Sequence, residues 1–204
     1  MIAQKVLFLV LDGISDRPCD VLDGRTPLAA ARTPVLDRLA AEGVCGIMDS
    51  IAPGIRPGSD TSHLALLGYP PQEYYTGRGP LEAEGTGIRM TAGMIGFRCN
   101  FAATDAEGRV TDRRAGRISG TAPLAEAIRD GVDLSPLGVG FRFESGAGHR
   151  AALALAGSGL GDKVSSNDPK RDGVRPPAIR PCTDDPEDGK TAEACNEFIR
   201  QSHD

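Results

Sequence analysis

The sequence predicts an α/β protein in which a parallel sheet with flanking helices is joined to a smaller α+β domain. Residues 6–11 (VLFLVL) are continuously apolar, a pattern typical of a parallel strand that is covered on both faces. A helical pattern over residues 33–43 and a short apolar segment over residues 45–51 continue the alternation of strand and helix. After residue 87, short segments of alternating character indicate hairpin strands instead.

The first predicted strand ends at Asp12 and Gly13. Asp12 is therefore expected at the carboxyl end of a strand, the edge where open α/β sheets bind ligands. An Asp-Gly pair is also common in turns, so the position of Asp12 fits either a ligand-binding residue or a turn residue. The helix that follows has clear end signals, with Thr33 as its N-cap, Pro34 in its first turn and Gly43 after its last turn.

Another helix is predicted from about Asp60 to Leu67, after a loop rich in proline and glycine. Ser59 lies at its start, in the segment PGSDTS, where Ser59, Asp60 and Thr61 are all good caps. The same helix N-terminus would stabilise an attacking alkoxide or a phosphate on Ser59. Because a serine nucleophile needs a base or a metal, Asp12 is a candidate to hold the cation. The spacing of residues therefore leaves open whether Ser59 is a helix cap or a nucleophile.

The sequence predicts hairpins in the second half of the chain. The segments MIGFRCNFA and RVTDRR have the character of strands, and a later hairpin is expected to turn around residues 145–148. We expect residues 1–88 to belong to the first domain and residues 89–204 to form the smaller α+β domain.

The last part of the sequence predicts a long loop and a terminal helix. Residues 165–190 are rich in proline, aspartate and glycine. Helical spacing resumes over residues 190–201, with Thr191 as a candidate cap.

Composition excludes several classes of partner. The net charge of −5 and the low aromatic content of 4% argue against nucleic acid. The longest apolar run is six residues, too short to span a bilayer, and the N-terminus lacks a signal-peptide pattern, so we expect a cytoplasmic protein without a membrane partner. The five cysteines are scattered, which indicates reduced and mostly buried thiols rather than disulfides or a zinc site.

Several long segments resemble the archaeal-type 2,3-bisphosphoglycerate-independent phosphoglycerate mutases. They are listed in chain order: LVLDGISDRP, TPLAAARTPVLDRLAAEG, IAPGIRPGSDTSHLALLGY, YYTGRGPLEAEG, FRCNFAATD and DRRAGRI. This family belongs to the alkaline phosphatase superfamily. The resemblance implies an alkaline-phosphatase-like α/β domain that is interrupted, after the nucleophile, by an inserted substrate-binding domain.

The resemblance also implies roles for Asp12 and Ser59. Asp12 would be a metal ligand, and Ser59 would be the nucleophile that becomes phosphoserine while also contacting a metal. The implied reaction moves a phosphate between the 3- and 2-hydroxyls of glycerate. Two divalent ions would assist, with Mn²⁺ preferred over Mg²⁺, Co²⁺ or Zn²⁺, and no 2,3-bisphosphoglycerate cofactor would be needed.

A small, highly anionic substrate requires arginine side chains that can form paired hydrogen bonds. The best candidates in the second domain are Arg113, Arg114 and Arg117 of the segment DRRAGR, together with His149 and Arg150. Arginines on hairpins taken alone are more often solvated surface residues.

The chain departs from the family pattern in two ways. It has Lys170 after Asp168 and Pro169, where the family usually has histidine. The family is also about twice as long, and its remaining metal ligands follow the point where this sequence stops. We therefore expect the N-terminal half of the enzyme, with a missing or separately encoded C-terminal half as its partner. The alternatives are another phosphomutase or phosphatase of the superfamily, or a non-catalytic fragment that binds a sugar phosphate or a partner half.

Overall fold

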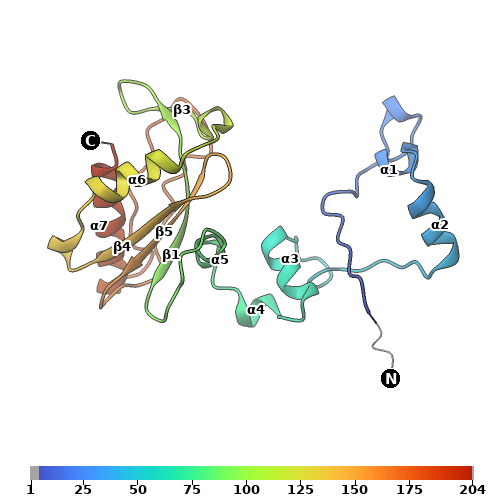
Figure 1. The fold of residues 1–204 in the computed structure, drawn as a ribbon, viewed down its shortest axis with the longest axis horizontal. Coiled ribbons are helices and arrows are strands. Elements are labelled where there is room, and N and C mark those ends of the chain that lie inside the picture. Colours follow the sequence, from blue (N-terminus) through green and yellow to red (C-terminus); the bar gives the residue numbers. More distant parts are fainter. Residues whose placement is uncertain (1–4, 204) are drawn as a thin grey trace. The chain divides into compact units, whose positions relative to one another are not determined.

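A computed structural model describes residues 5–203, which form two compact units, Met1–Tyr75 and Thr76–Asp204. Figure 1 labels the α-helices of both units and most of the strands. No helix within residues 5–203 is long and apolar enough to cross a membrane.

The first unit contains short helices joined by loops. They are η1 (Asp20–Leu22), α1 (Pro27–Ala30), α2 (Pro34–Glu42), α3 (Ser59–Leu66) and α4 (Pro71–Tyr74). The predicted helix after Thr33 is confirmed by α2, which has Pro34 in its first turn and ends at Gly43. The Thr33 hydroxyl donates to Asp37 Oδ1 at 2.9 Å and does not cap a backbone N–H group.

The two strands predicted in the first unit are wrong as local structure. Residues 6–11 and 45–51 form no strand, and side chains such as Val6, Leu7 and Ile47 are at least 90% exposed. The physical reason is that a strand needs hydrogen-bonded neighbours and covered faces, and the described residues supply neither to these segments. The α/β class is confirmed as a mixture of helices and sheets, but every strand pair among residues 5–203 is antiparallel.

The second unit is built around a three-stranded antiparallel sheet in the order β1-β5-β4. Its strands are β1 (Ile95–Asn100), β4 (Gly140–Ser145) and β5 (Arg150–Ala156). β4 and β5 form the hairpin predicted around residues 145–148. A small second sheet pairs β2 (Ala103–Thr104) with β3 (Val110–Asp112).

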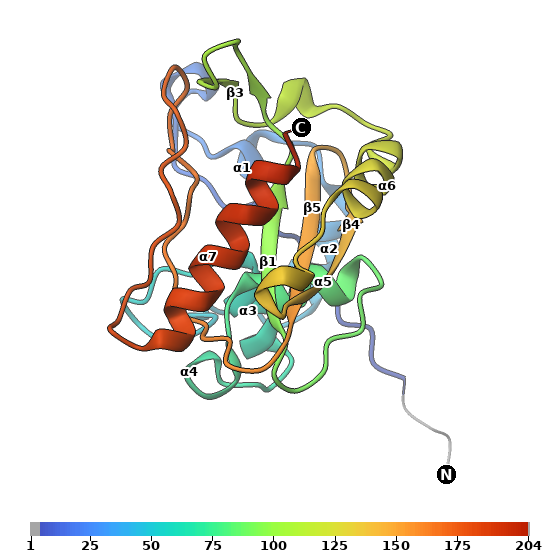
Figure 2. The same cartoon turned by 90° about the vertical axis from the view of Figure 1, so that its left-hand side faces the viewer.

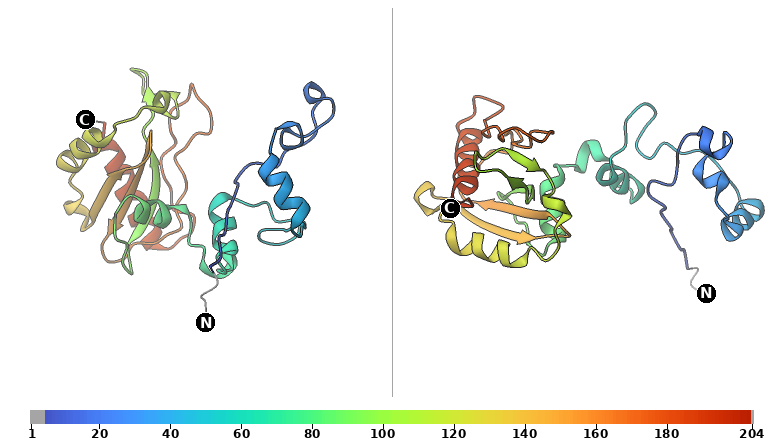
Figure 3. Two further views of the ribbon diagram at one scale, coloured as in Figure 1. Left: turned by 45° about the vertical axis from the view of Figure 1, so that its right-hand side comes forward. Right: turned by 90° about the horizontal axis from the view of Figure 1, so that it is seen from above.

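Three α-helices cover the larger sheet. They are α5 (Arg78–Gly85), α6 (Ala122–Gly131) and α7 (Pro186–Gln201), and the short turns η2 (Ala115–Arg117) and η3 (Ser135–Leu137) lie in the connections. Residues of α6 and α7 pack in one apolar cluster with the sheet, whereas α5 contributes to a separate cluster. Figures 2 and 3 show α6 and α7 lying along the sheet.

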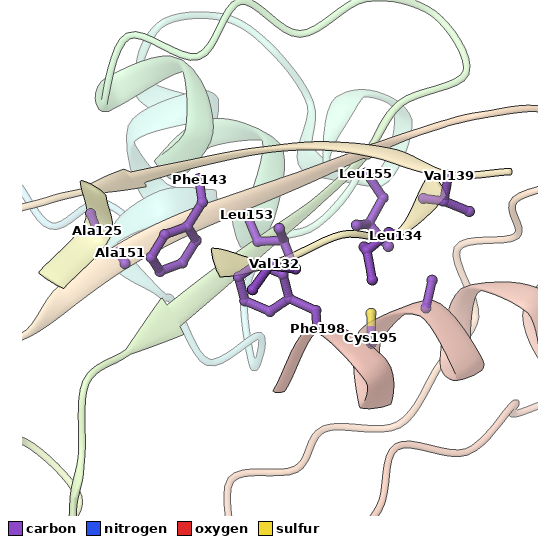
Figure 4. Packing of buried hydrophobic residues seen from close by; sticks show 11 residues of the cluster. Ala125, Val132, Leu134, Val139, Phe143, Ala151, Leu153, Leu155, Cys195 and Phe198 are labelled. Atoms are coloured by element: carbon purple, nitrogen blue, oxygen red, sulfur yellow. The ribbon is translucent and has the colours of Figure 1, made fainter. Parts of the chain in front are cut away.

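The core follows the alternation of β5. Leu153 and Leu155 point into the cluster that α6 and α7 cover, and Ala152 and Ala154 point toward α5. Phe143 of β4 packs on Phe198 of α7, with ring centroids 5.2 Å apart (Figure 4). Burying each large apolar side chain contributes about 1.5–3 kcal/mol, so this cluster stabilises the second unit substantially.

The start of α5 lies directly on β1. A Cβ atom on Gly79 would come 1.8 Å from the carbonyl oxygen of Gly96, so only glycine fits at this position. This packing makes α5 part of the second unit, and the chain therefore divides between residues 75 and 76. The domain boundary predicted after residue 88 stays a prediction about functional domains.

The terminal helix begins earlier than predicted. Asp185 caps α7 by accepting from the N–H group of Glu187 at 2.9 Å, and Pro186 occupies the first turn. Asp188, in the same turn, is buried and accepts from the N–H group of Lys163 at 3.0 Å. The candidate cap, Thr191, is instead a buried residue inside the helix.

Candidate functional site

Ser59 is the first residue of α3 and not its cap. The N-cap is Gly58, whose N–H group donates to Thr61 Oγ1 at 3.1 Å, so threonine satisfies the helix end. The Ser59 hydroxyl donates instead to Asp12 Oδ2 at 3.2 Å. The cap interpretation of Ser59 is therefore wrong, and its hydroxyl is available at the N-terminus of a helix beside a carboxylate.

The pair formed by Ser59 and Asp12 joins two segments that lie far apart in sequence. Both side chains are exposed, so a ligand in solution can reach them. The N-terminus of α3 carries partial positive charge and backbone N–H groups that suit a phosphate. A carboxylate is a far weaker base than a serine alkoxide, so Asp12 orients the hydroxyl but does not by itself activate it.

A neighbouring histidine does not take the role of a base. The Nδ1 atom of His63, one turn further along α3, lies 2.5 Å from the backbone carbonyl oxygen of Ser59. This contact uses the backbone of Ser59 and not its hydroxyl. Activation of the serine therefore requires a group other than the His63 ring in this arrangement.

A complete metal centre is not present within residues 5–203. Asp12 and Ser59 offer two oxygen ligands, but no group of three or more histidine, cysteine, aspartate or glutamate residues in this part of the chain could hold an ion. Divalent ions in proteins need more ligands than this pair provides. The described residues alone do not fit the two-metal site that the resemblance implies.

The cysteines also offer no metal site. Cys195 is buried, but Cys45 and Cys182 are exposed, so the expectation of mostly buried thiols is wrong. Burial raises the pKa values of Cys99 and Cys195 to about 12, which keeps both thiols protonated and unreactive at neutral pH.

Arg113 pairs with the chain itself. Its Nε and Nη2 atoms donate to the two carboxylate oxygens of Asp168 at 2.9 and 2.8 Å, and Nη1 donates to the backbone carbonyl of Lys170 at 3.2 Å. The hydrogen bonds from Arg113 hold the pKa of Asp168 well below its usual range, against the opposing effect of burial. This bidentate pair argues against Arg113 as a substrate ligand.

The next residues form a tight turn with left-handed backbone. Ala115, Gly116 and Arg117 have φ angles of 43°, 63° and 56°, which are unfavourable for the two residues that carry side chains. The Asp112 carboxylate holds this turn, because it accepts from the N–H groups of Arg114 and Gly116, each at 2.7 Å. The turn fixes the backbone from which Arg114 and Arg117 project.

His149 lies in the β4–β5 turn with its backbone fixed on both sides. Its carbonyl accepts from the N–H group of Phe101 at 2.7 Å, and the buried Thr121 hydroxyl donates to the Gly148 carbonyl at 3.1 Å. Burial lowers the pKa of His149, and the nearby positive charges lower it further. These charges belong to Arg114, Arg150, Arg98 and Arg117.

We call Arg98, Arg114, Arg117, His149 and Arg150 the cationic cluster. The structure thus brings four of the five predicted substrate residues together and pairs the fifth, Arg113, with Asp168. Sequence reasoning missed Arg98, which lies in the middle of β1. Its position depends on the pairing of β1 with β5, and the signals in the sequence were an arginine inside a predicted strand and its place in the family-like segment FRCNFAATD.

Comparison with known proteins identifies the family. A model of the family described as 2,3-bisphosphoglycerate-independent phosphoglycerate mutase matches residues 40–204. The chain belongs to this phosphoglycerate mutase family. A relative with this family name from Methanoculleus marisnigri is 86% identical over 202 residues, which are 99% of this chain and 49% of the relative. Another, from Archaeoglobus fulgidus, is 53% identical over 98% of this chain and 48% of the relative.

Two solved structures are also similar. A cofactor-independent phosphoglycerate mutase from Thermoplasma acidophilum matches with a TM-score of 0.60 and 45% identity, over 95% of this chain and 50% of that one. The PH0037 protein from Pyrococcus horikoshii matches with a TM-score of 0.64 and 27% identity, over 95% and 42%. The chain thus spans about half the length of the phosphoglycerate mutases that it matches, and the resemblance inferred from the sequence is confirmed.

Proposed function

We propose that this chain supplies the nucleophile and the substrate-binding part of a phosphoglycerate mutase that interconverts 3-phosphoglycerate and 2-phosphoglycerate. The observation that carries the proposal is the hydrogen bond between Ser59 and Asp12 at the N-terminus of α3. This interconversion is a step of glycolysis and gluconeogenesis, so the proposal includes a cytoplasmic location.

The proposed reaction has two transfers that mirror each other. Ser59 Oγ forms a bond to the phosphorus of 3-phosphoglycerate, the bond from phosphorus to the 3-oxygen breaks, and the serine proton ends on that oxygen. The glycerate then turns so that its 2-oxygen forms a bond to the phosphorus of phosphoserine, the bond from phosphorus to Ser59 Oγ breaks, and the proton of the 2-hydroxyl ends on Ser59 Oγ. The phosphoryl group is held by the protein between the steps, so no 2,3-bisphosphoglycerate is consumed.

Two divalent metal ions, with Mn²⁺ preferred, belong to the proposal. Bound ions would lower the pKa of the serine and offset the charge of the phosphoryl group. Asp12 and Ser59 would provide two of the ligands. We propose that the others come from the part of the relatives' length that this chain does not span.

The cationic cluster is proposed to bind the glycerate phosphate. Phosphoglycerate carries a carboxylate and a phosphate, and arginine binds both groups through paired hydrogen bonds. His149 has a lowered pKa, caused first by burial, so it is neutral at pH 7 and can donate a hydrogen bond without adding charge.

The decisive experiment combines this chain with the remaining half of the Methanoculleus marisnigri relative. We expect negligible turnover of 3-phosphoglycerate with Mn²⁺ by the chain alone and clear turnover by the mixture. In the mixture, Ser59→Ala should lower turnover by roughly 10³-fold or more, because alanine has no phosphoryl acceptor. Mass spectrometry should locate phosphate on Ser59 of the wild-type chain after exposure to substrate.

Thr61→Ala is the matched control. It removes the hydroxyl that accepts from the Gly58 N–H group and should cost about 1 kcal/mol of stability while most of the turnover remains. Retained turnover in Ser59→Ala, or phosphate trapped on another residue, would show that the nucleophile is misassigned. Robust turnover by the chain alone would contradict the proposed need for a second half.

A further inference from the structure

The pairing of β1 with β5 gathers arginines on one face of the sheet. In the register of these strands Arg98 lies opposite Ala152, and Asn100 lies opposite Arg150. Arg98 and Arg150 are therefore diagonal neighbours, with backbones about 7–8 Å apart, and their side chains leave the same face. The opposite face, with Phe97 and Cys99, packs into the core that α6 and α7 cover.

Arg98 is poorly satisfied by its own chain. Its Nε atom is buried and has no hydrogen-bond partner within residues 5–203. Glu82 of α5 is the acidic side chain beside it, but the distance from Nε to Glu82 Oε1 is 3.5 Å. In contrast, Arg113 holds Asp168 through two hydrogen bonds of 2.8 and 2.9 Å. The contact between Arg98 and Glu82 is therefore an ion pair that lacks the short, paired hydrogen bonds by which a structural arginine is held.

The charges around Arg98 are unbalanced. The cationic cluster holds four arginines near His149, Asp112 and Glu82 lie close to members of the cluster, and Glu144 on β4 is paired with Arg129. Asp112 already accepts from two backbone N–H groups, so its charge is partly compensated by the turn. Like charges in partly buried positions repel one another unless an anion joins them.

We propose that Arg98 is an anion-binding residue of the second unit, which takes a phosphate or carboxylate group of the ligand together with Arg150 and Arg114. This inference rests on the proposed function and extends it to Arg98, which lies in the family-like segment FRCNFAATD but was not among the residues predicted to bind substrate. Glu82 lies beside the charge of Arg98, and the arriving anion supplies the hydrogen bonds that Glu82 does not.

The test uses the full chain and two probes, inorganic phosphate and 3-phosphoglycerate. Binding is followed by calorimetry and by the amide resonances of residues 98, 114 and 150. Arg98→Gln should weaken the binding of both probes by about tenfold or more, because a charge-assisted hydrogen-bond pair is lost. Arg98→Lys keeps the charge and the stem, and should bind with intermediate affinity.

Two further variants serve as controls. Arg142→Gln removes an exposed arginine from the same face of the sheet, opposite Ala154, and should leave the affinity unchanged. Glu82→Gln removes the ion-pair partner of Arg98 and should bind phosphate at least as tightly as the wild type. If Arg98 only supported the packing of α5, Glu82→Gln and Arg98→Gln would weaken binding equally.

The outcomes separate this inference from the proposed function. Wild-type affinity in a folded Arg98→Gln variant overturns the role of Arg98, whatever the mixture of halves does in the mutase assay. Absence of phosphate and phosphoglycerate binding by the wild-type chain also overturns it. The proposed mutase function is decided separately, by Ser59→Ala and by phosphate on Ser59.

Discussion

The two compact units use their apolar residues in opposite ways. None of the described residues 5–75 is buried, and Val6 and Leu7 are each 90% exposed. In the second unit Leu134 and Leu155 are almost fully buried. Among the described residues, the large apolar side chains exposed in the second unit are Leu81, Ile118 and Leu124, and the other exposed ones belong to the first unit.

The difference shows what an apolar segment needs before it becomes a strand. β5 has β1 and β4 as hydrogen-bonded neighbours and helices on both faces. Residues 6–11 are at least as apolar but have no neighbouring strand among the described residues. Backbone groups must be paired when a segment is buried, so the segment cannot bury itself alone. Residues 6–11 can become a strand only where neighbouring strands pair with their backbone groups.

Hydrogen exchange should give the largest contrast between the units. We expect the amides of residues 6–11 to exchange with little protection in this chain, and those of β5 to be protected by roughly 10³-fold or more. Adding the remaining half of the Methanoculleus marisnigri relative should protect residues 6–11 and leave β5 unchanged. Strong protection of residues 6–11 in the chain alone would mean that the comparison between the units is wrong.

The contact between α5 and β1 offers the next largest effect. Gly79→Ala places a Cβ atom 1.8 Å from the Gly96 carbonyl and should destabilise the second unit by about 3–5 kcal/mol. Gly85→Ala is the matched control, because the same substitution in the same helix meets nothing within 4 Å. It should be neutral or raise stability by up to about 1 kcal/mol. Equal melting temperatures for the two variants would contradict the close packing.

The pair Arg113 and Asp168 tests a smaller effect within the second unit. Arg113→Ala and Asp168→Ala should each lower the melting temperature by about 2–6 °C, and the double variant should lose less than the sum. Because the pKa of Asp168 is lowered, its contribution is present above about pH 4 and is lost as the pH falls further. If Arg113 binds substrate instead, its loss would change KM without changing stability.

The smallest expected effect concerns His149. Arg114→Gln should raise the pKa of His149, followed by nuclear magnetic resonance, because it removes the nearby positive charge that acts after burial. Arg142→Gln should not change this pKa. Since the folded-state pKa lies below the ordinary value of about 6.5, the unfolded chain binds more protons just below that pH, and stability falls on acidification. An unchanged pKa in Arg114→Gln would show that the cationic cluster is not assembled.

Local signals in the sequence were reliable where short-range chemistry decides the structure. The ends of α2 followed from Thr33, Pro34 and Gly43, and the β4–β5 hairpin followed from its glycine-rich turn. The start of α7 was misplaced because Asp185 and Pro186, which are strong N-terminal signals, were assigned to the preceding loop. The parallel sheet was predicted from apolar character, which does not reveal whether a partner strand is present.

By itself the sequence determined the family, the α/β class and the candidate residues Asp12 and Ser59, because long contiguous segments and local end signals are carried by neighbouring residues. Only the tertiary structure decided how these residues are used. It shows that Gly58 is the N-cap of α3 and that Thr61, not Ser59, provides the capping hydroxyl. It also shows that Arg113 pairs with Asp168. It also added Arg98 to the cationic cluster. These assignments depend on distances across strands and loops, which are set by register and packing and not by spacing along the chain.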